Sequence, residues 1–318
     1  MFIKAFSKVA VIICIILVFI ISLGPYFVDP GHTEHIQQGT YNEDSLYDVL
    51  LMGSSHMEDM IDPSFLYDKY KITSYNYATG GQPLNVTYYL LEEALKVQSP
   101  KIVVLDLYYC GLADKYGDEN YMRYALDNMK FSSTKLKAIA NCVPFKNQLE
   151  YYFPFIKYHG RWSSLKESDF DISTRLNPST TGYCVGDVVY GKPMNEWQHG
   201  DEIATLPEYS EKYINKFIKL SKEKNFDLIF VNAPYDYSGN NVSTWYTNDS
   251  ALYNSLSVIA SENNIPFLNY SSSELMDEIG FNFADDMYNI GHLNIYGSQK
   301  VNKHFADFLY NNYRNELT

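Results

Sequence analysis

Short, continuous apolar runs alternate with helix-like stretches over most of this chain. The runs cover residues 47–52, 72–77, 102–105, 228–231 and 266–268. A strand that is apolar at nearly every position has to be covered on both faces, as in parallel sheets flanked by helices. The sequence therefore predicts an α/β fold in which a parallel sheet lies between two layers of helices.

Apolar residues at helical spacing occupy the segments between these runs. The Thr-Leu-Pro-Glu sequence at residues 205–208 has the spacing of a capping box and predicts the start of one helix. A second helix should carry Leu252 and Leu256 on one face, and the last helix should carry Val301 and Phe305. These helices are expected to cover the sheet.

Residues 108–205 lack this alternation and are rich in Tyr, Phe, Asn and Trp. We interpret them as an insertion in a domain that covers residues 47–318. Loops at the carboxyl ends of parallel strands are where ligands bind, so the insertion is expected to shape a substrate pocket. Its apolar residues could equally form the core of a small helical subdomain.

The N-terminal residues predict a membrane anchor. Residues 9–28 are almost wholly apolar and would form a helix of about 30 Å, which matches a bilayer core. A cleaved signal peptide is the alternative, but no good cleavage site follows the stretch. Lys4 and Lys8 precede it and Asp29 follows, which predicts residues 1–8 in the cytoplasm, a linker at 29–46 and an extracytoplasmic domain.

Composition narrows the class of partner. The formal net charge of -13 would repel phosphates over most of the surface, so nucleic acid is not an expected partner. The 30 tyrosines would suit sugar faces, but we interpret them as core and surface packing. The four cysteines have no spacing typical of a metal site or a disulfide framework, and no cofactor is indicated.

One serine stands where a nucleophile would be expected. Ser55 belongs to the run Gly53-Ser54-Ser55-His56, directly after the first predicted strand. Small residues before it let the backbone turn sharply at the edge of the sheet. The alternative is that Ser55 only caps the following helix with its hydroxyl.

A general base is expected from His292, in the run Gly291-His292-Leu293-Asn294-Ile295-Tyr296-Gly297 just before the last helix. Its loop and the Ser55 loop should open on the same edge of the sheet. His56 could be a second base or a donor to substrate, but we interpret it as structural. The same holds for His304, which lies among apolar residues of the last helix.

The runs around Ser55 and His292 resemble two blocks of the SGNH/GDSL hydrolase superfamily. In its membrane-anchored extracytoplasmic branch, related to proteins of polysaccharide O-acetylation and teichoic-acid D-alanylation, these blocks read Gly-x-Ser-His and Asp-x-x-His-Leu-Asn-x-x-Gly. The resemblance covers residues 47–110 and 206–313. It implies an SGNH-like three-layer sandwich in which Ser55 attacks an ester carbonyl and His292 takes its proton.

The resemblance also implies an oxyanion hole. One backbone donor would be Ser55, and the other a glycine after the second strand, for which Gly81 fits best and Gly80 next. Both glycines could instead only permit a tight turn. The asparagine donor that the family carries after its third strand is absent here, where the chain reads Leu-Asp-Leu-Tyr-Tyr over residues 105–109.

The third member of the triad is ambiguous. The family places an acid three residues before the histidine, where this chain has Asn289. Asp286 is our first choice if the loop folds back, and Asp285 and Asn289 are the alternatives. An asparagine can orient an imidazole but cannot stabilise its cation as a carboxylate does.

The expected function is that of a serine esterase or acyltransferase acting on O-acyl groups, acetyl above all, of a cell-envelope polysaccharide. The membrane and a membrane protein that donates acyl groups are the other partners that the resemblance implies. The alternative is an inactive domain of the same fold that binds glycan or serves as a scaffold. The asparagine at position 289, where the family has an acid, is the reason to consider it. A metal-dependent phosphoesterase lacks the cluster of Asp and His that it needs.

Overall fold

A computed structural model describes residues 2–28, 33, 35–111, 117–170, 181–194, 200–236 and 249–317. Asp29 and parts of the predicted linker and insertion lie outside these ranges. The described sheet has five parallel strands in the order β2-β1-β3-β4-β5. Their bounds are β1 Val49–Met52, β2 Ser74–Asn76, β3 Ile102–Asp106, β4 Asp227–Asn232 and β5 Phe267–Asn269. All five predicted strands are present, and the predicted α/β fold with a parallel sheet is confirmed.

Helices connect the strands and fill the segment after β3. Along the first part of the chain they are α1 Phe2–Phe27, α2 His35–Tyr41, α3 Ser55–Met60, α4 Pro63–Tyr70 and α5 Leu84–Ala94. Between β3 and β4 they are η2 Tyr108–Gly111, α6 Glu119–Leu126, α7 Ser133–Cys142, η3 Phe145–Asn147, α8 Gln148–Tyr152, α9 Pro154–Tyr158, η4 His159–Ser163, α10 Glu167–Phe170 and α12 Glu208–Lys224. The rest are α13 Asp249–Glu262, α14 Ser273–Glu278, α15 Phe283–Asp286 and α16 Ile295–Leu317.

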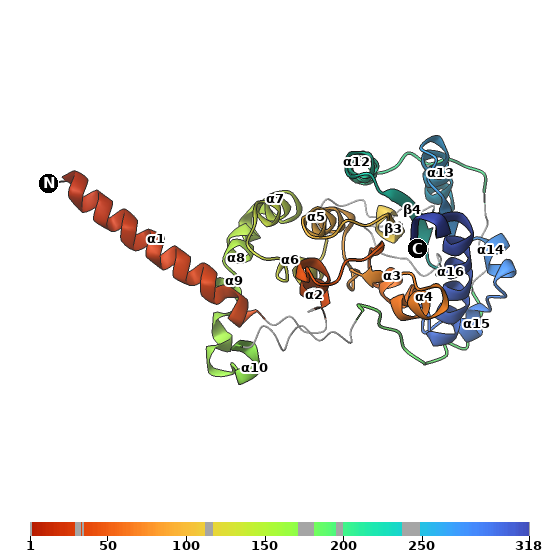
Figure 1. The fold of residues 1–318 in the computed structure, drawn as a ribbon, viewed down its shortest axis with the longest axis horizontal. Helices are drawn as coiled ribbons and strands as arrows, with labels where there is room; N and C mark the ends of the chain where they lie inside the picture. The colour runs from red at the N-terminus through yellow and green to blue at the C-terminus, as the bar shows by residue number, and fades with distance from the viewer. Residues whose placement is uncertain are drawn as a thin grey trace.

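Successive residues of the central strands point into two different cores. Leu50 of β1 packs into a core that also holds side chains of α5, α12 and α13. Its neighbour Leu51 packs into a second core with α3, α4 and α16. Because side chains alternate along a strand, an apolar run is what buries both faces of a sheet. Figure 1 shows helices on both sides of the strands, so the layers are helix, sheet and helix.

The predicted capping box is wrong. Helix α12 begins at Glu208, its N-cap is Pro207, and the cap makes no side-chain hydrogen bond. A capping box needs a hydroxyl residue at the N-cap and the acid three positions later. Here the acid is the first helical residue, because Pro207 accepts the extended backbone of the cap position and Thr205 lies before it.

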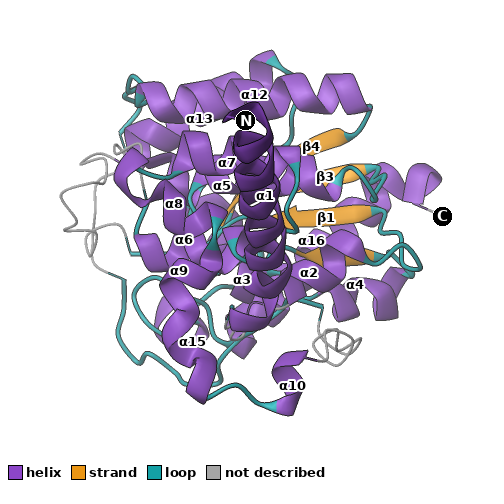
Figure 2. Ribbon diagram, turned by 90° about the vertical axis from the view of Figure 1, so that its left-hand side faces the viewer, coloured by secondary structure: helices purple, strands orange, loops and turns teal. Residues whose placement is uncertain are grey.

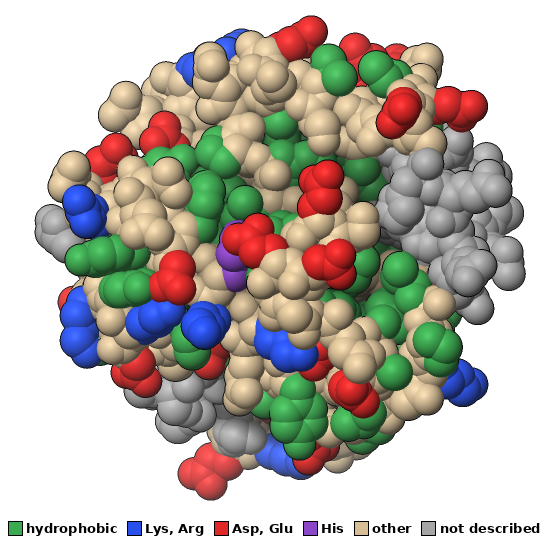
Figure 3. All heavy atoms as spheres, turned by 90° about the vertical axis from the view of Figure 1, so that its right-hand side faces the viewer, with side chains coloured by type: hydrophobic (Ala, Val, Ile, Leu, Met, Phe, Trp, Pro, Cys, Tyr) green, Lys and Arg blue, Asp and Glu red, His purple; other side chains and the backbone are tan. Residues whose placement is uncertain are grey.

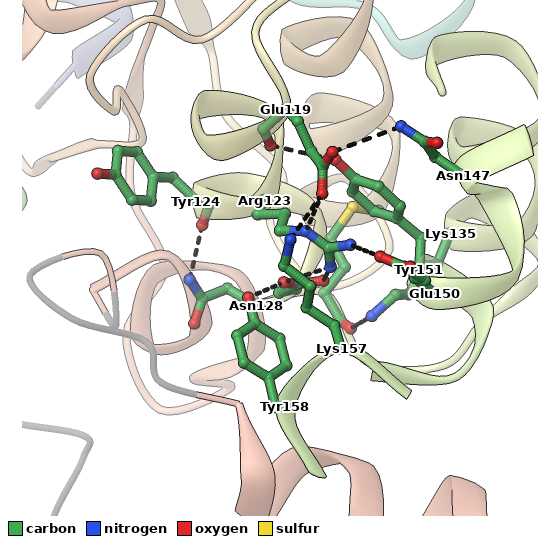
Figure 4. Close-up of polar contacts among 12 residues, drawn as sticks. Glu119, Arg123, Tyr124, Asn128, Lys135, Asn147, Glu150, Tyr151, Lys157 and Tyr158 are labelled. Carbon is green, nitrogen blue, oxygen red and sulfur yellow. Dashed lines mark hydrogen bonds and ion pairs between the residues drawn. The ribbon is translucent and has the colours of Figure 1, made fainter. Parts of the chain in front are cut away.

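Helices α6, α8 and α9 are joined by a polar cluster around Arg123 (Figure 4). The Arg123 guanidinium lies 3.2 Å from Asp127 and 3.3 Å from Glu150. It also stacks over the ring of Tyr151, 3.9 Å from the ring centroid. Tyr158 of α9 donates a hydrogen bond to Asp127 at 2.7 Å. These buried contacts hold α8 and α9 against α6, within the segment that the sequence marked as an insertion.

Helix α1 stands away from the rest of the molecule (Figure 1). Residues Ser7–Phe27 are long and apolar enough to cross a membrane, and little of this segment is buried. Only its last residues touch the domain, chiefly at α9. Figure 2 looks along α1 onto the face from which it projects. The helix ends at Phe27, one residue before the predicted end of the apolar stretch.

Candidate active site

Ser55 is the first residue of α3, and only Gly53 and Ser54 separate it from β1. The helix cap is its neighbour Ser54, whose side chain accepts a hydrogen bond from the amide of His56. The alternative that Ser55 serves as the cap is therefore wrong. The Ser55 hydroxyl is left half-buried at the carboxyl edge of the sheet, where it is available for another partner.

That partner is His292. The Ser55 Oγ atom lies 2.8 Å from His292 Nε2, although 237 residues separate the two in the chain. His292 is in the loop between α15 and α16, which faces the same edge of the sheet as the β1–α3 connection. The structure thus brings together the two residues that the sequence singled out as nucleophile and base.

Asn289 lies on the other side of the imidazole. Its Oδ1 atom is 3.2 Å from His292 Nδ1 and also accepts hydrogen bonds from the amides of Gly291 and His292. Two backbone donors fix this atom as the oxygen of the side-chain amide. An oxygen cannot donate, so the proton must sit on Nδ1. His292 Nε2 is then unprotonated and accepts the hydrogen bond of the Ser55 hydroxyl.

The carboxylates considered for this role have other partners. Asp286, our first choice, accepts hydrogen bonds from the amide of Asn282 and from Lys300 Nζ, both at 2.6 Å. Asp285 accepts a hydrogen bond from Asn282 Nδ2 at 2.7 Å. The geometry therefore favours Asn289 over both. The loop does not fold back far enough to exchange them, because Asp286 is buried in its ion pair with Lys300.

Burial sets the protonation state of the base. Desolvation lowers the pKa of His292 from the ordinary histidine value of 6.5, because the cation loses more hydration than the neutral ring. His292 is thus neutral at pH 7 and able to accept a proton. A neutral asparagine at Nδ1 does nothing to reverse this shift, whereas a carboxylate would raise the pKa.

Asp106 anchors the serine loop. This buried residue at the end of β3 accepts hydrogen bonds on Oδ2 from the Ser54 amide at 3.2 Å and from the Ser54 hydroxyl at 2.8 Å. Its Oδ1 accepts another from the Tyr108 amide at 3.0 Å. A Cβ on Gly53 would lie 2.4 Å from Asp106 Cβ, so the close approach requires glycine at that position. Asp106 belongs to the run Leu-Asp-Leu-Tyr-Tyr of residues 105–109, in which the sequence predicts no role for the carboxylate.

His56 packs beside the two reacting groups. Its ring stacks on Tyr108 with a centroid distance of 3.6 Å, and the His292 ring lies 5.1 Å away. Burial and, to a lesser degree, His292 hold the pKa of His56 well below its ordinary value. His56 Nδ1 is buried and makes no hydrogen bond. These contacts fit a neutral ring that fills space behind the Ser55–His292 pair.

The candidate oxyanion donors come from neighbouring strands. Strands β1 and β2 are parallel and paired, so Ser55 and the loop after β2 lie on one edge. Ser55 opens α3, where amides lack an acceptor within the helix. Gly81 has φ of +62°, and a Cβ there would lie 2.1 Å from the ring of Tyr121. Gly81 is thus required by both backbone angle and space, while a Cβ on Gly80 would meet nothing closer than 3.8 Å.

Residues 181–190 of the predicted insertion, here called the strap, cross the carboxyl edge of the sheet. The Asn76 amide of β2 donates to Thr181 O, and the Cys184 amide donates to Glu58 O of α3. Further along, Ile295 N donates to Gly186 O at 2.9 Å. The strap therefore connects the β2 loop, the serine helix and the histidine loop. Sequence reasoning placed this segment near the substrate but had no signal for its backbone pairing.

Asn294 braces the histidine loop from within. Its Nδ2 donates to the carbonyls of Asp285 and Met287, and its Oδ1 accepts from the amides of Tyr296 and Gly297. A Cβ on Gly297 would lie 2.2 Å from Asp286 O. The asparagine and glycine of the His-Leu-Asn-x-x-Gly run thus hold the loop in shape. In the described ranges, no group of three or more His, Cys, Asp or Glu side chains is arranged to hold a metal ion.

Comparisons with known proteins add little to this geometry. No protein-family model matches the chain. No curated protein matches its sequence. Among solved structures, the chain is similar to an acetyl xylan esterase from the rumen bacterium Butyrivibrio proteoclasticus, with 11% identity and a TM-score of 0.30 over 83% of this chain. The match spans 64% of that esterase's length. At this level the similarity carries no argument about function, which has to come from the site.

Proposed function

We propose that this protein is a serine esterase or acyltransferase in which Ser55 is the nucleophile and His292 the general base. The observation that carries the proposal is the 2.8 Å contact between Ser55 Oγ and the unprotonated Nε2 of His292, with Asn289 Oδ1 fixing the tautomer. A nucleophile, a base in reach of it and a third group that orients the base form the recognised arrangement for acyl transfer.

The first half of the reaction forms an acyl-enzyme. Ser55 Oγ bonds to the carbonyl carbon of the ester while its proton passes to His292 Nε2. The negative charge on the carbonyl oxygen is stabilised by backbone amides, for which Ser55 and Gly81 are the candidates. The bond to the alcohol then breaks, and the alcohol leaves with the proton from Nε2. Acyl-Ser55 and a neutral His292 remain.

The second half regenerates the serine. His292 removes a proton from an incoming hydroxyl, whose oxygen attacks the acyl carbon, and returns a proton to Ser55 Oγ as the bond breaks. Water makes the enzyme an esterase, and a sugar hydroxyl makes it an acetyltransferase. The same residues serve both, so the choice depends on which acceptor occupies the site.

We propose an O-acetylated glycan of the cell envelope as the substrate. Helix α1 would hold the domain at the membrane, and Lys4 and Lys8 before it favour an extracytoplasmic domain. The net charge of -13 disfavours polyphosphate partners, whereas an acetyl ester on a sugar is uncharged. A membrane protein that supplies acetyl groups would be the matching partner if transfer is the reaction.

A fluorophosphonate probe tests the nucleophile. It should label the detergent-solubilised wild-type protein, and Ser55→Ala should lose labelling while retaining its circular dichroism spectrum. Ser64→Ala, at an exposed serine of α4, is the matched control and should label like wild type. Release of 4-nitrophenol from 4-nitrophenyl acetate should follow the same pattern. A folded wild type that neither labels nor releases product would overturn the proposal.

Asn289 favours one alternative, a glycan-binding or scaffold domain without catalysis. A neutral residue at this position leaves the imidazolium without a counter-charge, which slows acyl transfer. This reading predicts an unlabelled protein that still binds O-acetylated polysaccharide with equal affinity in wild type and Ser55→Ala. Isothermal titration with both proteins, beside the labelling experiment, separates the two functions.

A further inference from the structure

The end of α1 is embedded in a short helical segment, residues 145–170. Phe27 lies edge-on to Phe155 of α9 with ring centroids 4.9 Å apart, and Tyr26 stacks on Phe170 at 5.7 Å. Arg161 donates a hydrogen bond to the carbonyl of Phe27 at 2.7 Å. These contacts fix the direction in which the apolar helix leaves the domain.

The same segment exposes large apolar side chains. They have between 40% and 89% of their surface exposed and are Phe145, Leu149, Ile156, Trp162 and Phe170. We call these five residues the apolar collar. Scattered exposed apolar residues are ordinary, but five within 26 positions are not, and Ile156, Trp162 and Phe170 belong to α9, η4 and α10, which contact α1. Such a surface indicates contact with a non-aqueous phase.

Two residues of the apolar collar lie next to side chains that form ion pairs with α6. Lys157, next to Ile156, forms an ion pair with Glu119 of α6 at 3.1 Å, and Glu150, next to Leu149, pairs with Arg123 at 3.3 Å. Figure 4 shows these side chains converging from α6, α8 and α9. Turning Leu149 or Ile156 inward would therefore break the contacts that α8 and α9 make with α6.

Charge in this segment differs from that of the whole chain. Residues 145–170 carry four basic and three acidic side chains, while the chain as a whole has a net charge of -13. The opposite face of the molecule, shown in Figure 3, has charged side chains of both signs scattered over it. This segment is thus repelled less by anionic lipid headgroups than the acidic chain as a whole.

We propose that the apolar collar lies in the headgroup region of the bilayer that α1 spans, so that the domain rests on the lipid surface. A 21-residue span rises about 30 Å, which places Phe27 at the boundary of the hydrocarbon core, next to the collar residues of α9, η4 and α10. Aromatic side chains such as Trp162 favour that boundary. The inference rests on the proposed membrane role of α1 and is independent of catalysis.

The experiment uses tryptophan as a depth probe. The chain has three tryptophans, so Trp197→Phe with Trp245→Phe leaves Trp162 as the single emitter. The full-length variant is placed in nanodiscs containing lipids brominated near the headgroup. The matched control replaces Trp162 by Phe and carries Tyr67→Trp instead. Tyr67 is exposed. It belongs to α4, which lies at the other end of the molecule from α1 (Figure 1).

Brominated lipid should quench roughly half of the Trp162 emission and leave the Tyr67→Trp control nearly unchanged. Adding Phe145→Asp and Leu149→Asp should weaken the quenching of Trp162, while Ser55→Ala should leave it as it is. Equal quenching of Trp162 and the control would overturn the proposal, as would failure of the full chain to enter nanodiscs. A protein that is quenched as expected but inactive would contradict only the proposed catalysis.

Discussion

The serine loop, between β1 and α3, and the histidine loop, between α15 and α16, meet where Ser55 contacts His292. Different contacts hold each loop in shape. The serine loop depends on a distant side chain, since Asp106 of β3 is 52 residues away from the Ser54 amide and hydroxyl it binds. The histidine loop depends more on its own side chains, because Asn289 and Asn294 bond to groups within nine residues of their own positions. Its distant partners are backbone groups, such as Gly186, which accepts from Ile295. Damage to the first loop should therefore cost fold stability, and damage to the second should cost mainly chemistry.

The largest expected effect comes from removing the base. His292→Ala should lower kcat on 4-nitrophenyl acetate by roughly 100- to 10,000-fold, because Ser55 then has no acceptor for its proton. Thermal unfolding should move far less than activity, since the loop is braced by Asn294. Turnover by His292→Ala near the wild-type rate would contradict the assignment.

A large effect on stability is expected at Asp106. Asp106→Ala removes the acceptor for the Ser54 and Tyr108 amides and should lower the free energy of unfolding by about 2 to 3 kcal/mol. Asp106→Asn keeps one acceptor oxygen, so its free energy of unfolding should fall by less than that of Asp106→Ala. Urea denaturation of both variants measures this. If both unfold like wild type, the serine loop does not depend on this side chain.

Substitutions at Asn289 should change chemistry by a smaller amount. Asn289→Asp places a carboxylate at Nδ1, which should stabilise the imidazolium and raise kcat by about tenfold, equivalent to about 1.4 kcal/mol. Asn289→Ala should lower kcat because the tautomer is no longer fixed. The matched control, Asp286→Asn, should keep its kcat and lose stability through the Lys300 ion pair. A loss of kcat in the control alone would point to Asp286 as the orienting residue.

The pH dependence of kcat/KM should also change when Asn289 is replaced. As the pH falls through the pKa of His292, Nε2 takes up a proton and the base is lost. Burial lowers that pKa, so the midpoint of the acidic limb of kcat/KM should lie below pH 6.5 in the wild type. Asn289→Asp should move this midpoint to higher pH. A wild-type midpoint above 6.5 would mean that a negative charge faces the imidazole.

The smallest effect is expected from His56. His56→Phe keeps a ring against Tyr108 and removes a buried nitrogen that makes no hydrogen bond. Both kcat and the unfolding midpoint should stay close to wild type. A loss of kcat greater than about tenfold, at unchanged stability, would instead give His56 a direct part in the reaction.

Much of the fold could be predicted because it follows from local pattern. Apolar runs identified all five strands, and their ends differ from the predicted ones by no more than two residues. The capping box failed because Pro207 takes the cap position. The Ser55–His292 pair was predictable because both residues follow the topology of the parallel sheet, although their catalytic roles stay a prediction.

The rest of the site depends on contacts that a sequence does not display. The role of Asp106 is not visible in the sequence because its partner Ser54 is far away in the chain. The strap of residues 181–190 is not visible either, because it pairs through backbone groups that every residue carries. Asn289 was ranked behind Asp286 because a carboxylate is the stronger chemical partner for a histidine. In the structure the residue three positions before His292 contacts the imidazole, and the carboxylate of Asp286 instead binds Lys300.

The asparagine beside His292 also determines how charge is balanced during the proposed reaction. With Ser55, His292 and Asn289 the resting group is neutral, and the cation that forms on the imidazole is matched by the anion that forms on the ester oxygen. A carboxylate in place of Asn289 would leave one surplus negative charge at each stage. The neutral group therefore matches an uncharged ester, but it lacks the carboxylate that would speed proton transfer.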